Sequence, residues 1–546
     1  MPTATAGSSS GADWSSAAPM PSTDERALSA SGRRFAIATP HWAATRAGVA
    51  AFDAGGNAVD AALAAAVTLA VVYPHMCGVG GDLFALVQAV NGQTIALNAS
   101  GAAPLAIDAS AIRATHDAMP EYGPLTITVP GAVSGWASLA ELGADLPFER
   151  AFGPAIAYAR DGIPVARSLG SSLTWEPERL FADPGMRSVF AREGLPLTEG
   201  DTVVQPSLAT TLETIAVEGP SVLYGGEVGA RLVTGLRAAG SPIVLEDLAS
   251  HRPQLDSPIA ARYRDLHVSV VPPNSQGFAL LEMLLAAERL EIDPDPLGAD
   301  AAVLAEVFAA ASEDRDRHNA DPRHARVPVG TLLDEGHIAA LCDQVRAGRV
   351  GIGSRSAGDT IALATADGGG RAVSLIQSLS SGFGSGILET STGVVCHNRG
   401  QGFSLDPHSP NSLAGGKRPA HTLMPVLAHR EGRLAAVTGS MGGGGQPQIN
   451  FQDLVRAFDL GMDPEAALSA PRWLMGGMDL HPGRSVELEA GVPTWVRDAF
   501  ERSGFALTLL GDRDDGVGHA QLIRVADDGT LVAATDPRAD GEAAAG

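Results

Sequence analysis

The fold is decided by residues 358–363, which read Gly-Asp-Thr-Ile-Ala-Leu and lie about two-thirds of the way along the chain. Thr360 opens an alternating apolar run that is typical of a β-strand. The run turns through residues 367–370, Asp-Gly-Gly-Gly, and returns as a second strand over residues 371–378. If the chain is cut before Thr360, the new terminus carries a hydroxyl nucleophile and an amine base in one residue. An α-amino group titrates near ~8, so it can act as that base around neutral pH.

Thr360 also has an ordinary interpretation as a structural residue, because threonine is common at the start of strands.

The composition of the chain excludes some classes of function. The chain has 546 residues, of which 45% are hydrophobic, and a formal net charge of −24. That charge disfavours nucleic acid and anionic membranes as partners, since phosphate groups are bound by clustered cations. The spacing of Cys77, Cys342 and Cys396 fits neither a disulfide framework nor a zinc site, so buried reduced thiols and a cytoplasmic location are predicted.

Three segments are predicted along the chain. Residues 1–34 are rich in Ser, Ala, Gly and Pro and lack the apolar core of a signal peptide, so we expect a disordered tail. Residues 35–359 form the second segment and 360–546 the third. Residues 345–359, rich in Gly, Ser and Arg, have the composition of an exposed connector and a processing site.

Hydrophobic periodicity predicts stacked sheets with helical layers outside them. Helix is expected over residues 41–73 with a break at 55–57, and the apolar part of this region is too short to span a bilayer. Hairpins are expected around Asn91, Asp367, Glu431 and Asp528. The other expected elements are helices at 153–160, 208–217, 279–290, 302–318, 452–460 and 494–503, and a strand at 266–271.

Four segments could supply chemistry near Thr360. Residues 439–445 read Gly-Ser-Met-Gly-Gly-Gly-Gly, and polyglycine after a strand leaves backbone N–H groups free to form an oxyanion hole. A flexible turn is the ordinary alternative. A phosphate-binding loop is another, but the Lys and Ser or Thr of that motif are missing.

The other three segments supply polar side chains. His421 and Thr422 could donate hydrogen bonds to a substrate, and Arg399 could pair with a substrate carboxylate. Ser378 and Ser380 lie on the return strand of the Thr360 hairpin, where a cross-strand hydroxyl could orient the nucleophile. Each also has an ordinary alternative: a structural histidine, a surface ion pair, and serines on a solvated strand face.

Several sequence blocks follow one another along the chain: residues 54–62, 78–82, 129–133, 417–419 and 535–538. In this order they make the chain similar to the γ-glutamyltranspeptidase family of N-terminal-nucleophile hydrolases. The resemblance runs from about Ala38 to Gly541. It implies an α+β fold, the four-layer αββα sandwich of that hydrolase type. It also implies self-cleavage between Asp359 and Thr360 and a heterodimer of the two fragments. By the same resemblance Gly442 and Gly443 form the oxyanion hole, and Ser378 takes the place of a second, supporting threonine.

The departures from the family pattern concern the substrate head group. The arginine that holds the α-carboxylate is missing from the equivalent run at residues 100–104, Ser-Gly-Ala-Ala-Pro. The aspartate for the α-amine falls on Gly402, an asparagine falls on Ser380, and a serine pair falls on His421 and Thr422. Losing a buried ionic partner typically costs roughly 2–5 kcal/mol, so γ-glutamyl transfer is disfavoured. The nearby sequence instead resembles a branch similar to oxamate amidohydrolases.

The sequence therefore predicts an autoprocessed N-terminal-threonine amidohydrolase that cleaves a small acidic amide, such as an oxamate-like one, through an acyl-enzyme. The predicted substrate-binding residues are Arg399, Ser380, His421, Thr422 and Ser100. No metal or organic cofactor is required. Two alternatives stay open: a γ-glutamyl hydrolase or transpeptidase acting on glutathione, and an uncleaved, non-catalytic small-molecule-binding protein.

Overall fold

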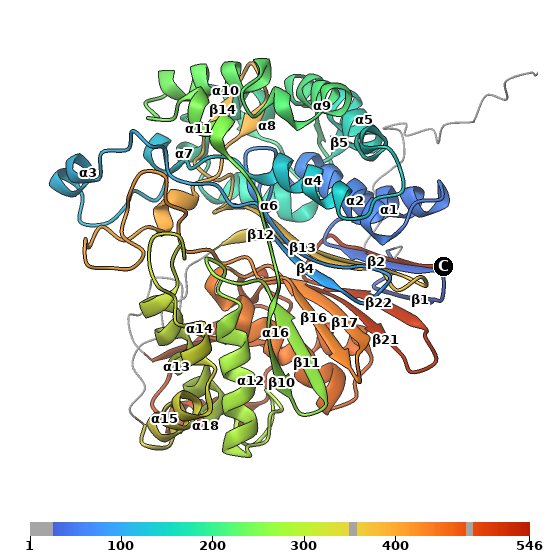
Figure 1. The fold of residues 1–546 in the computed structure, drawn as a ribbon, viewed down its shortest axis with the longest axis vertical. Helices are drawn as coiled ribbons and strands as arrows, with labels where there is room; N and C mark the ends of the chain where they lie inside the picture. The colour runs from blue at the N-terminus through green and yellow to red at the C-terminus, as the bar shows by residue number, and fades with distance from the viewer. Residues whose placement is uncertain (1–25, 349–357, 477–483) are drawn as a thin grey trace, which may run out of the picture.

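The computed structural model describes residues 26–348, 358–476 and 484–546, and it contains two stacked seven-stranded sheets between two helical layers (Figure 1). Neighbouring strands in both sheets are antiparallel. The first sheet has the order β23 (Glu542–Ala545), β2 (Phe35–Thr39), β12 (Asp359–Asp367), β13 (Ala372–Ser380), β3 (Asp82–Gln88), β4 (Thr94–Asn98) and β9 (Gln254–Asp256). The second has the order β1 (Ser29–Gly32), β22 (Leu531–Thr535), β21 (Ala520–Val525), β17 (Arg433–Ser440), β16 (Val426–Arg430), β11 (Leu266–Val270) and β10 (Ile259–Tyr263). The predicted α+β four-layer arrangement is confirmed.

The hairpin that begins at Thr360 lies at the centre of the first sheet. Its side chains alternate between two cores, as a strand buried on both faces requires. Ala362 and Ala364 face the space between the sheets, and these small side chains allow the sheets to approach closely. Ile361 and Leu363 face the helical layer on the other side. The alternation fixes the register, because a slip of one residue would exchange the two faces.

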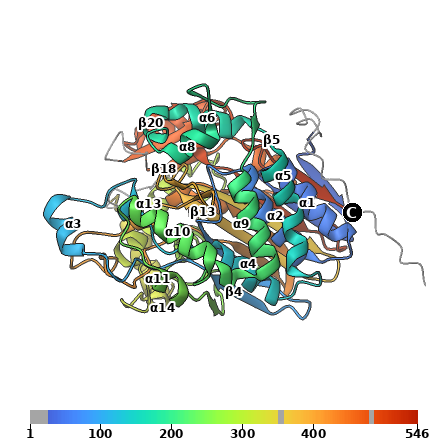
Figure 2. The same ribbon diagram turned by 90° about the horizontal axis from the view of Figure 1, so that it is seen from above.

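One helical layer covers the outer face of the first sheet, and Figure 2 shows its helices from above. Helix α2 is buried along its whole length, and its Asn57 cap accepts hydrogen bonds from the backbone while Asp60 completes a capping box. The predicted break at residues 55–57 is confirmed. The main helices of this layer are α1 (Trp42–Asp53), α2 (Ala58–Val72), α4 (Ala132–Glu141), α5 (Gly153–Asp161), α9 (Pro206–Glu218) and α10 (Glu227–Ala238).

The other helical layer covers the second sheet. Its helices are α12 (Phe278–Leu290), α13 (Ala301–His318), α15 (Glu335–Arg346), α16 (Gln446–Leu454) and α18 (Thr494–Arg502). A small sheet of β18 (Trp473–Met475), β19 (Ser485–Glu489) and β20 (Ala506–Leu510) packs beside them. The helix expected over 452–460 begins earlier, at Gln446, and ends in a π-helical turn, Val455–Asp459.

The remaining described elements are short. The helices are α3 (Ala109–Thr115), α6 (Arg167–Trp175), α7 (Pro177–Leu180), α8 (Pro184–Phe190), α11 (Leu245–Ser250), α14 (Val329–Leu332) and α17 (Pro464–Ser469). The two-residue strands are β5 (Ile163–Pro164), β6 (Ala191–Arg192), β7 (Leu195–Pro196), β8 (Thr202–Val203), β14 (Leu388–Glu389) and β15 (Val394–Val395).

The disordered tail predicted for residues 1–34 is wrong in its last part. Ser29–Gly32 forms strand β1 and pairs with β22. The partner strand lies about 500 positions further along the chain. A Ser- and Gly-rich composition cannot reveal such a distant partner. Residues 1–25 and most of the predicted connector, 349–357, lie outside the described residues.

Two further expectations concern cysteines and membranes. Cys77, Cys342 and Cys396 are buried and form no disulfide, as predicted. Within the described ranges, no helix combines the length and apolarity needed to cross a bilayer.

Candidate active site

Thr360 is fully buried at the start of β12, directly opposite Ser378 on β13. A register shift between Asp359 and Thr360 marks an irregularity in the ladder at the bond that is expected to break. Thr360 Oγ1 donates a hydrogen bond to Ser378 Oγ at 3.1 Å. Ser378 Oγ in turn donates to the carbonyl oxygen of Asp359 at 2.6 Å. One hydroxyl therefore touches both the predicted nucleophile and the carbonyl that the nucleophile would attack.

The glycine loop lies against the same bond. A Cβ atom on Gly358 would come within 2.8 Å of Gly443 Cα, so only glycine permits this approach. Gly442 and Gly443 have φ angles of 142° and 53°, values that favour glycine. Among the described residues, neither of their N–H groups donates a hydrogen bond. The predicted oxyanion donors therefore lie next to the predicted cleavage site, and their N–H groups are not used by hydrogen bonds within the described residues.

Two side chains donate hydrogen bonds to carbonyl groups of this loop. Gln276 Nε2 donates to the carbonyl oxygen of Gly443 at 2.9 Å. Arg315 Nη1 donates to that of Gly444 at 2.8 Å. Each carbonyl shares its peptide plane with the N–H of the next residue, so these contacts fix the planes that directly follow Gly443 and Gly444 and limit the movement of the loop. Neither residue could be identified from a local sequence pattern, because both lie more than 120 positions before the loop.

Arg399 is buried at 5% exposure, and it is tied to the nucleophile through Ser378. Its Nη2 donates to Ser378 Oγ and its Nη1 to Thr422 Oγ1, both at 3.1 Å. Its Nε has no hydrogen-bond partner among the described residues, and no described carboxylate lies within 4.0 Å of the guanidinium. Burial lowers the pKa of Arg399 to about 10, although Asp82 opposes this shift, so the group stays cationic at neutral pH. A buried cation without a counter-ion is unfavourable, and an anionic ligand would compensate it.

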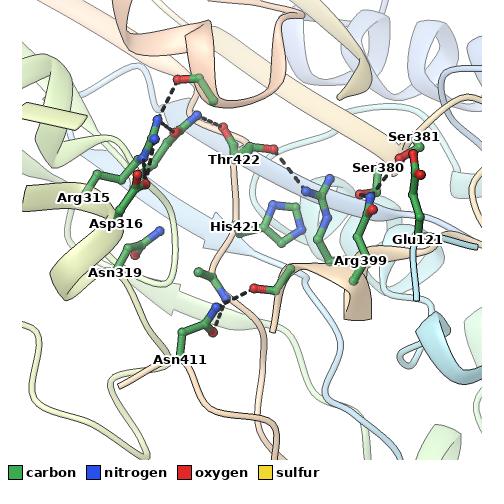
Figure 3. Close-up of a pocket in the computed structure, with 15 residues that line it drawn as sticks. Glu121, Arg315, Asp316, Asn319, Ser380, Ser381, Arg399, Asn411, His421 and Thr422 are labelled. Atoms are coloured by element: carbon green, nitrogen blue, oxygen red, sulfur yellow. Dashed lines mark hydrogen bonds and ion pairs between the residues drawn. The ribbon is translucent and has the colours of Figure 1, made fainter. Parts of the chain in front are cut away.

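A cavity of about 500 Å³ opens at this arginine, and Figure 3 shows the side chains around it. Four predicted substrate-binding residues line it: Ser380, Arg399, His421 and Thr422. Glycine 402 also lines it. The other lining residues are Glu121, Gln276, Arg315, Asp316, Asn319, Ser381, Gln401, Asn411, Ala420 and Gly444. Thr360 does not line the cavity in the continuous chain, because Ser378 lies between its hydroxyl and Arg399.

The remaining predicted residue, Ser100, lies apart from the cavity wall. Its hydroxyl donates to Asn98 Oδ1 at 2.7 Å and accepts from Asn274 Nδ2 at 3.2 Å, and the side chain is fully buried. In these two contacts the Ser100 hydroxyl hydrogen-bonds other protein side chains and stabilises the loop after β4. We therefore find no contact through which Ser100 would meet a ligand in this cavity.

His421 is fixed as a neutral hydrogen-bond donor. Burial, with the Arg399 charge acting in the same direction, lowers the pKa of His421 to about 3. Its Nδ1 accepts from the Leu423 backbone N–H at 3.3 Å, so Nε2 carries the proton and donates to Asp82 Oδ2 at 3.0 Å. With such a low pKa, His421 is unsuited to act as a general base at neutral pH.

Asp82 and His397 complete the buried network behind the cavity, and the sequence analysis gave neither a role. His397 Nδ1 lies 3.3 Å from Asp82 Oδ2. Burial by itself would raise the pKa of Asp82, but His397 and His421 hold it well below its usual range. Asp82 directly follows the glycine loop 78–81 and His397 lies two residues before Arg399. Their closeness in sequence to these segments is the signal that could have marked them as site residues.

Comparison with known proteins identifies the family of the chain. The family model described as gamma-glutamyltranspeptidase matches residues 44–546. An oxamate amidohydrolase proenzyme of Klebsiella pneumoniae is 36% identical, covering 92% of this chain and 97% of its own. The glutathione hydrolase-like YwrD proenzyme of Bacillus subtilis is 34% identical, covering 94% and 98%. The crystal structure of cephalosporin acylase from Bacillus halodurans superposes with a TM-score of 0.88 at 33% identity, covering 97% of this chain and 98% of that one.

These relatives are proenzymes and acylases of one family, and they match this chain over nearly its whole length. The chain is therefore an enzyme, which removes the non-catalytic alternative. Its predicted nucleophile, glycine loop and supporting serine lie together beside Arg399 and Gly444, which line the cavity. The chain belongs to the gamma-glutamyltranspeptidase family and is an amidohydrolase with the N-terminal-nucleophile hydrolase fold.

Proposed function

We propose that the chain cuts itself between Asp359 and Thr360, and that the mature enzyme hydrolyses a small amide bearing a carboxylate next to the reacting carbonyl. The observation that carries this proposal is Arg399, a buried cation with no described carboxylate partner. It lies one hydrogen-bonded residue from the nucleophile, at 3.1 Å from Ser378 Oγ. A carboxylate bound there would hold its neighbouring amide carbon within reach of Thr360.

Maturation begins with attack of Thr360 Oγ1 on the Asp359 carbonyl carbon. The hydroxyl of Ser378 already donates to that carbonyl oxygen at 2.6 Å, so it can stabilise the negative charge that develops there. The C–N bond then breaks, the proton that Thr360 Oγ1 loses on attack goes to the leaving Thr360 nitrogen, and Asp359 is left as an ester on Thr360 Oγ1. Water hydrolyses the ester, releasing a free carboxyl on Asp359 and a free amine on Thr360.

Catalysis by the mature enzyme reuses the same atoms. The free amine of Thr360 takes the proton from its own hydroxyl, and Oγ1 attacks the substrate amide carbon. The N–H groups of Gly442 and Gly443 bind the oxyanion. The protonated amine then gives its proton to the leaving nitrogen, and water releases the acyl group from Thr360. Every proton transfer uses Thr360, so no metal or organic cofactor enters these steps.

Charge in the cavity favours a small acidic acyl group. Arg315 is paired with Asp316 at 2.7 Å, which leaves Arg399 as the cation available to a ligand within the described wall. An oxamate-like amide has its carboxylate on the reacting carbonyl, which suits an arginine this near to the nucleophile. The 36% identity with an oxamate amidohydrolase proenzyme supports this choice.

Hydrolysis of a γ-glutamyl amide is the second candidate. Glu121 lies on the same cavity wall as Arg399, and its carboxylate could hold the α-ammonium group of a glutamyl substrate. The glutathione hydrolase-like relative, at 34% identity, also favours it.

The cleavage is tested on a denaturing gel with N-terminal sequencing. We expect two fragments, the smaller beginning at Thr360, and a Thr360→Ala variant that stays at the full mass of 55.8 kDa. An active enzyme that consists of one unbroken chain would overturn the proposal.

The substrate is tested with a panel of amides. Oxamate should be hydrolysed with a higher kcat/KM than glutathione or acetamide. Arg399→Gln should lower kcat/KM for oxamate by at least about 30-fold, since a buried ionic contact is worth roughly 2–5 kcal/mol. Acetamide has no carboxylate and serves as the matched control, so its kcat/KM should change only a few-fold. An equal loss for both amides would assign Arg399 to the nucleophile instead of the substrate.

A further inference from the structure

Three metal-ligating side chains converge away from the active site, where α12, α13 and α15 pack together. They are Glu282, Asp314 and His337, one from each helix. His337 Nε2 lies 2.8 Å from Asp314 Oδ2 and 3.6 Å from Glu282 Oε1. One ligand atom from each residue lies within 4.8 Å of the other two. None of the three lines the cavity beside Arg399.

The burial of the Glu282 carboxylate is not explained by an ion pair alone. Its side chain is 0% exposed, and neither carboxylate oxygen has a hydrogen-bond partner among the described residues. The nearest cationic group is His337, which at 3.6 Å is beyond hydrogen-bond distance and is already engaged with Asp314. A buried carboxylate with two unsatisfied oxygens is strongly unfavourable unless a cation compensates it.

The donor set indicates which cation fits. One imidazole and two carboxylates suit a first-row divalent ion such as Zn²⁺, whereas Mg²⁺ and Ca²⁺ prefer oxygen ligands alone. The side chains of Asp314 and His337 are 11% and 26% exposed, so an ion and a water ligand can enter from that side. Zn–N and Zn–O bonds of about 2.0–2.2 Å would need only small movements of these atoms.

We propose that Glu282, Asp314 and His337 bind one divalent transition-metal ion, with Zn²⁺ as the best match, and that the ion joins the three helices. The site is structural. It is also connected to the active site through the chain, because Arg315 follows Asp314 in α13 and donates to the Gly444 carbonyl at 2.8 Å. The proposal does not rest on the choice of amide substrate.

The test uses the full protein after treatment with a chelator and dialysis. Titration with Zn²⁺ in a calorimeter should give one equivalent bound, and the same addition should raise the melting temperature. Glu282→Gln and His337→Gln should weaken Zn²⁺ binding by about 100-fold or more, because each removes a ligand. His324→Gln is the matched control, since His324 is an exposed histidine outside the cluster, and it should bind like the wild type.

Circular dichroism shows whether each variant folds. If a variant does not fold, a second measurement on the wild-type protein tests the site without it. Co²⁺ added to the chelated wild-type protein should give visible absorption bands of a bound ion, and one equivalent of Zn²⁺ should remove them. Asp314→Asn, which changes the ligand from α13, is a third variant for the same titration. The proposal is overturned if the wild type binds no Zn²⁺, or if folded Glu282→Gln binds it with unchanged affinity and stoichiometry. Either result would leave a His–Asp hydrogen bond beside a protonated glutamic acid.

Discussion

The hydroxyl of Ser378 makes the contacts on which self-cleavage would depend. It accepts from Thr360 Oγ1 at 3.1 Å and donates to the Asp359 carbonyl at 2.6 Å. Ser378→Ala should therefore slow fragment formation by roughly 10²–10³-fold, the usual cost of removing one oxyanion donor. Ser378→Thr keeps the hydroxyl and should cut itself at close to the wild-type rate. The measurement is the disappearance of the full-length band over time after cell-free synthesis. Equal rates for the alanine and threonine variants would exclude this role.

Asp359 gives a residue-level prediction about pH. Burial raises the pKa of its carboxyl to about 6, with the Asp515 charge acting in the same direction and the Gly382 N–H opposing it. A raised carboxyl pKa means that the folded chain favours the protonated form. The stability linked to this group is complete below its unfolded pKa, near ~4, and is lost as pH rises through about 6.

The expected outcome follows in an uncut Thr360→Ala background. Adding Asp359→Asn should raise the melting temperature at pH 8, where the native carboxylate is charged, by the equivalent of roughly 1–2 kcal/mol. The difference should shrink as the pH falls towards ~3, below both pKa values, where Asp359 is neutral in the folded and unfolded states. Asp367→Asn serves as a control, because Asp367 lies at the other end of β12. A difference that grows on acidification would contradict the assigned direction.

At the level of elements, the glycine loop depends on side chains from the other fragment. Gln276 and Arg315 hold the carbonyls of Gly443 and Gly444 at 2.9 and 2.8 Å. Gly443 carries both the carbonyl that Gln276 holds and a predicted oxyanion N–H, so Gln276→Leu should let this donor move. We expect kcat to fall by roughly 10-fold or more with little change in KM, because oxyanion binding matters most in the transition state. Steady-state kinetics on the best amide measures this separation.

Gln452→Leu is the matched control for that change. Gln452 is also buried, and its Nε2 donates to the Trp473 carbonyl at 2.7 Å, away from the glycine loop. Both variants should lose thermal stability, since each leaves a buried carbonyl without its donor. Only Gln276→Leu should lose kcat. Equal kcat losses in the two variants would show a general packing effect in place of loop orientation.

What could be predicted from sequence was mostly local. The β12–β13 hairpin follows from alternation and an Asp-Gly turn, and the break between α1 and α2 follows from Gly55-Gly56-Asn57. The contact of Asp82 with His421 joins residues 339 positions apart, and no local pattern predicts it. The same holds for strand β1, whose partner is at the other end of the chain. For the site, the resemblance located Thr360, but the role of Gln276 needed the fold.

At the level of the whole molecule, the two predicted fragments are interleaved within both sheets. In the first sheet β2, from residues 35–359, lies between β23 and β12, which belong almost entirely to 360–546. In the second sheet β1 from the first fragment pairs with β22, and β11 pairs with β16. Separating the fragments would break strand pairings in both sheets and expose the apolar side chains packed on the faces of these sheets.

This arrangement predicts that cleavage leaves the assembly intact. The mature protein should elute from a sizing column with both fragments in equal amounts, and they should separate only in denaturant, in one transition with the loss of secondary structure. Strand β12 pairs with β2 on one side and β13 on the other, and a cut before Thr360 removes neither pairing. The uncut Thr360→Ala chain should therefore unfold at a denaturant concentration similar to that of the mature protein. Fragments that separate in native buffer while both keep their circular dichroism would mean that they are independent domains, contrary to the strand order.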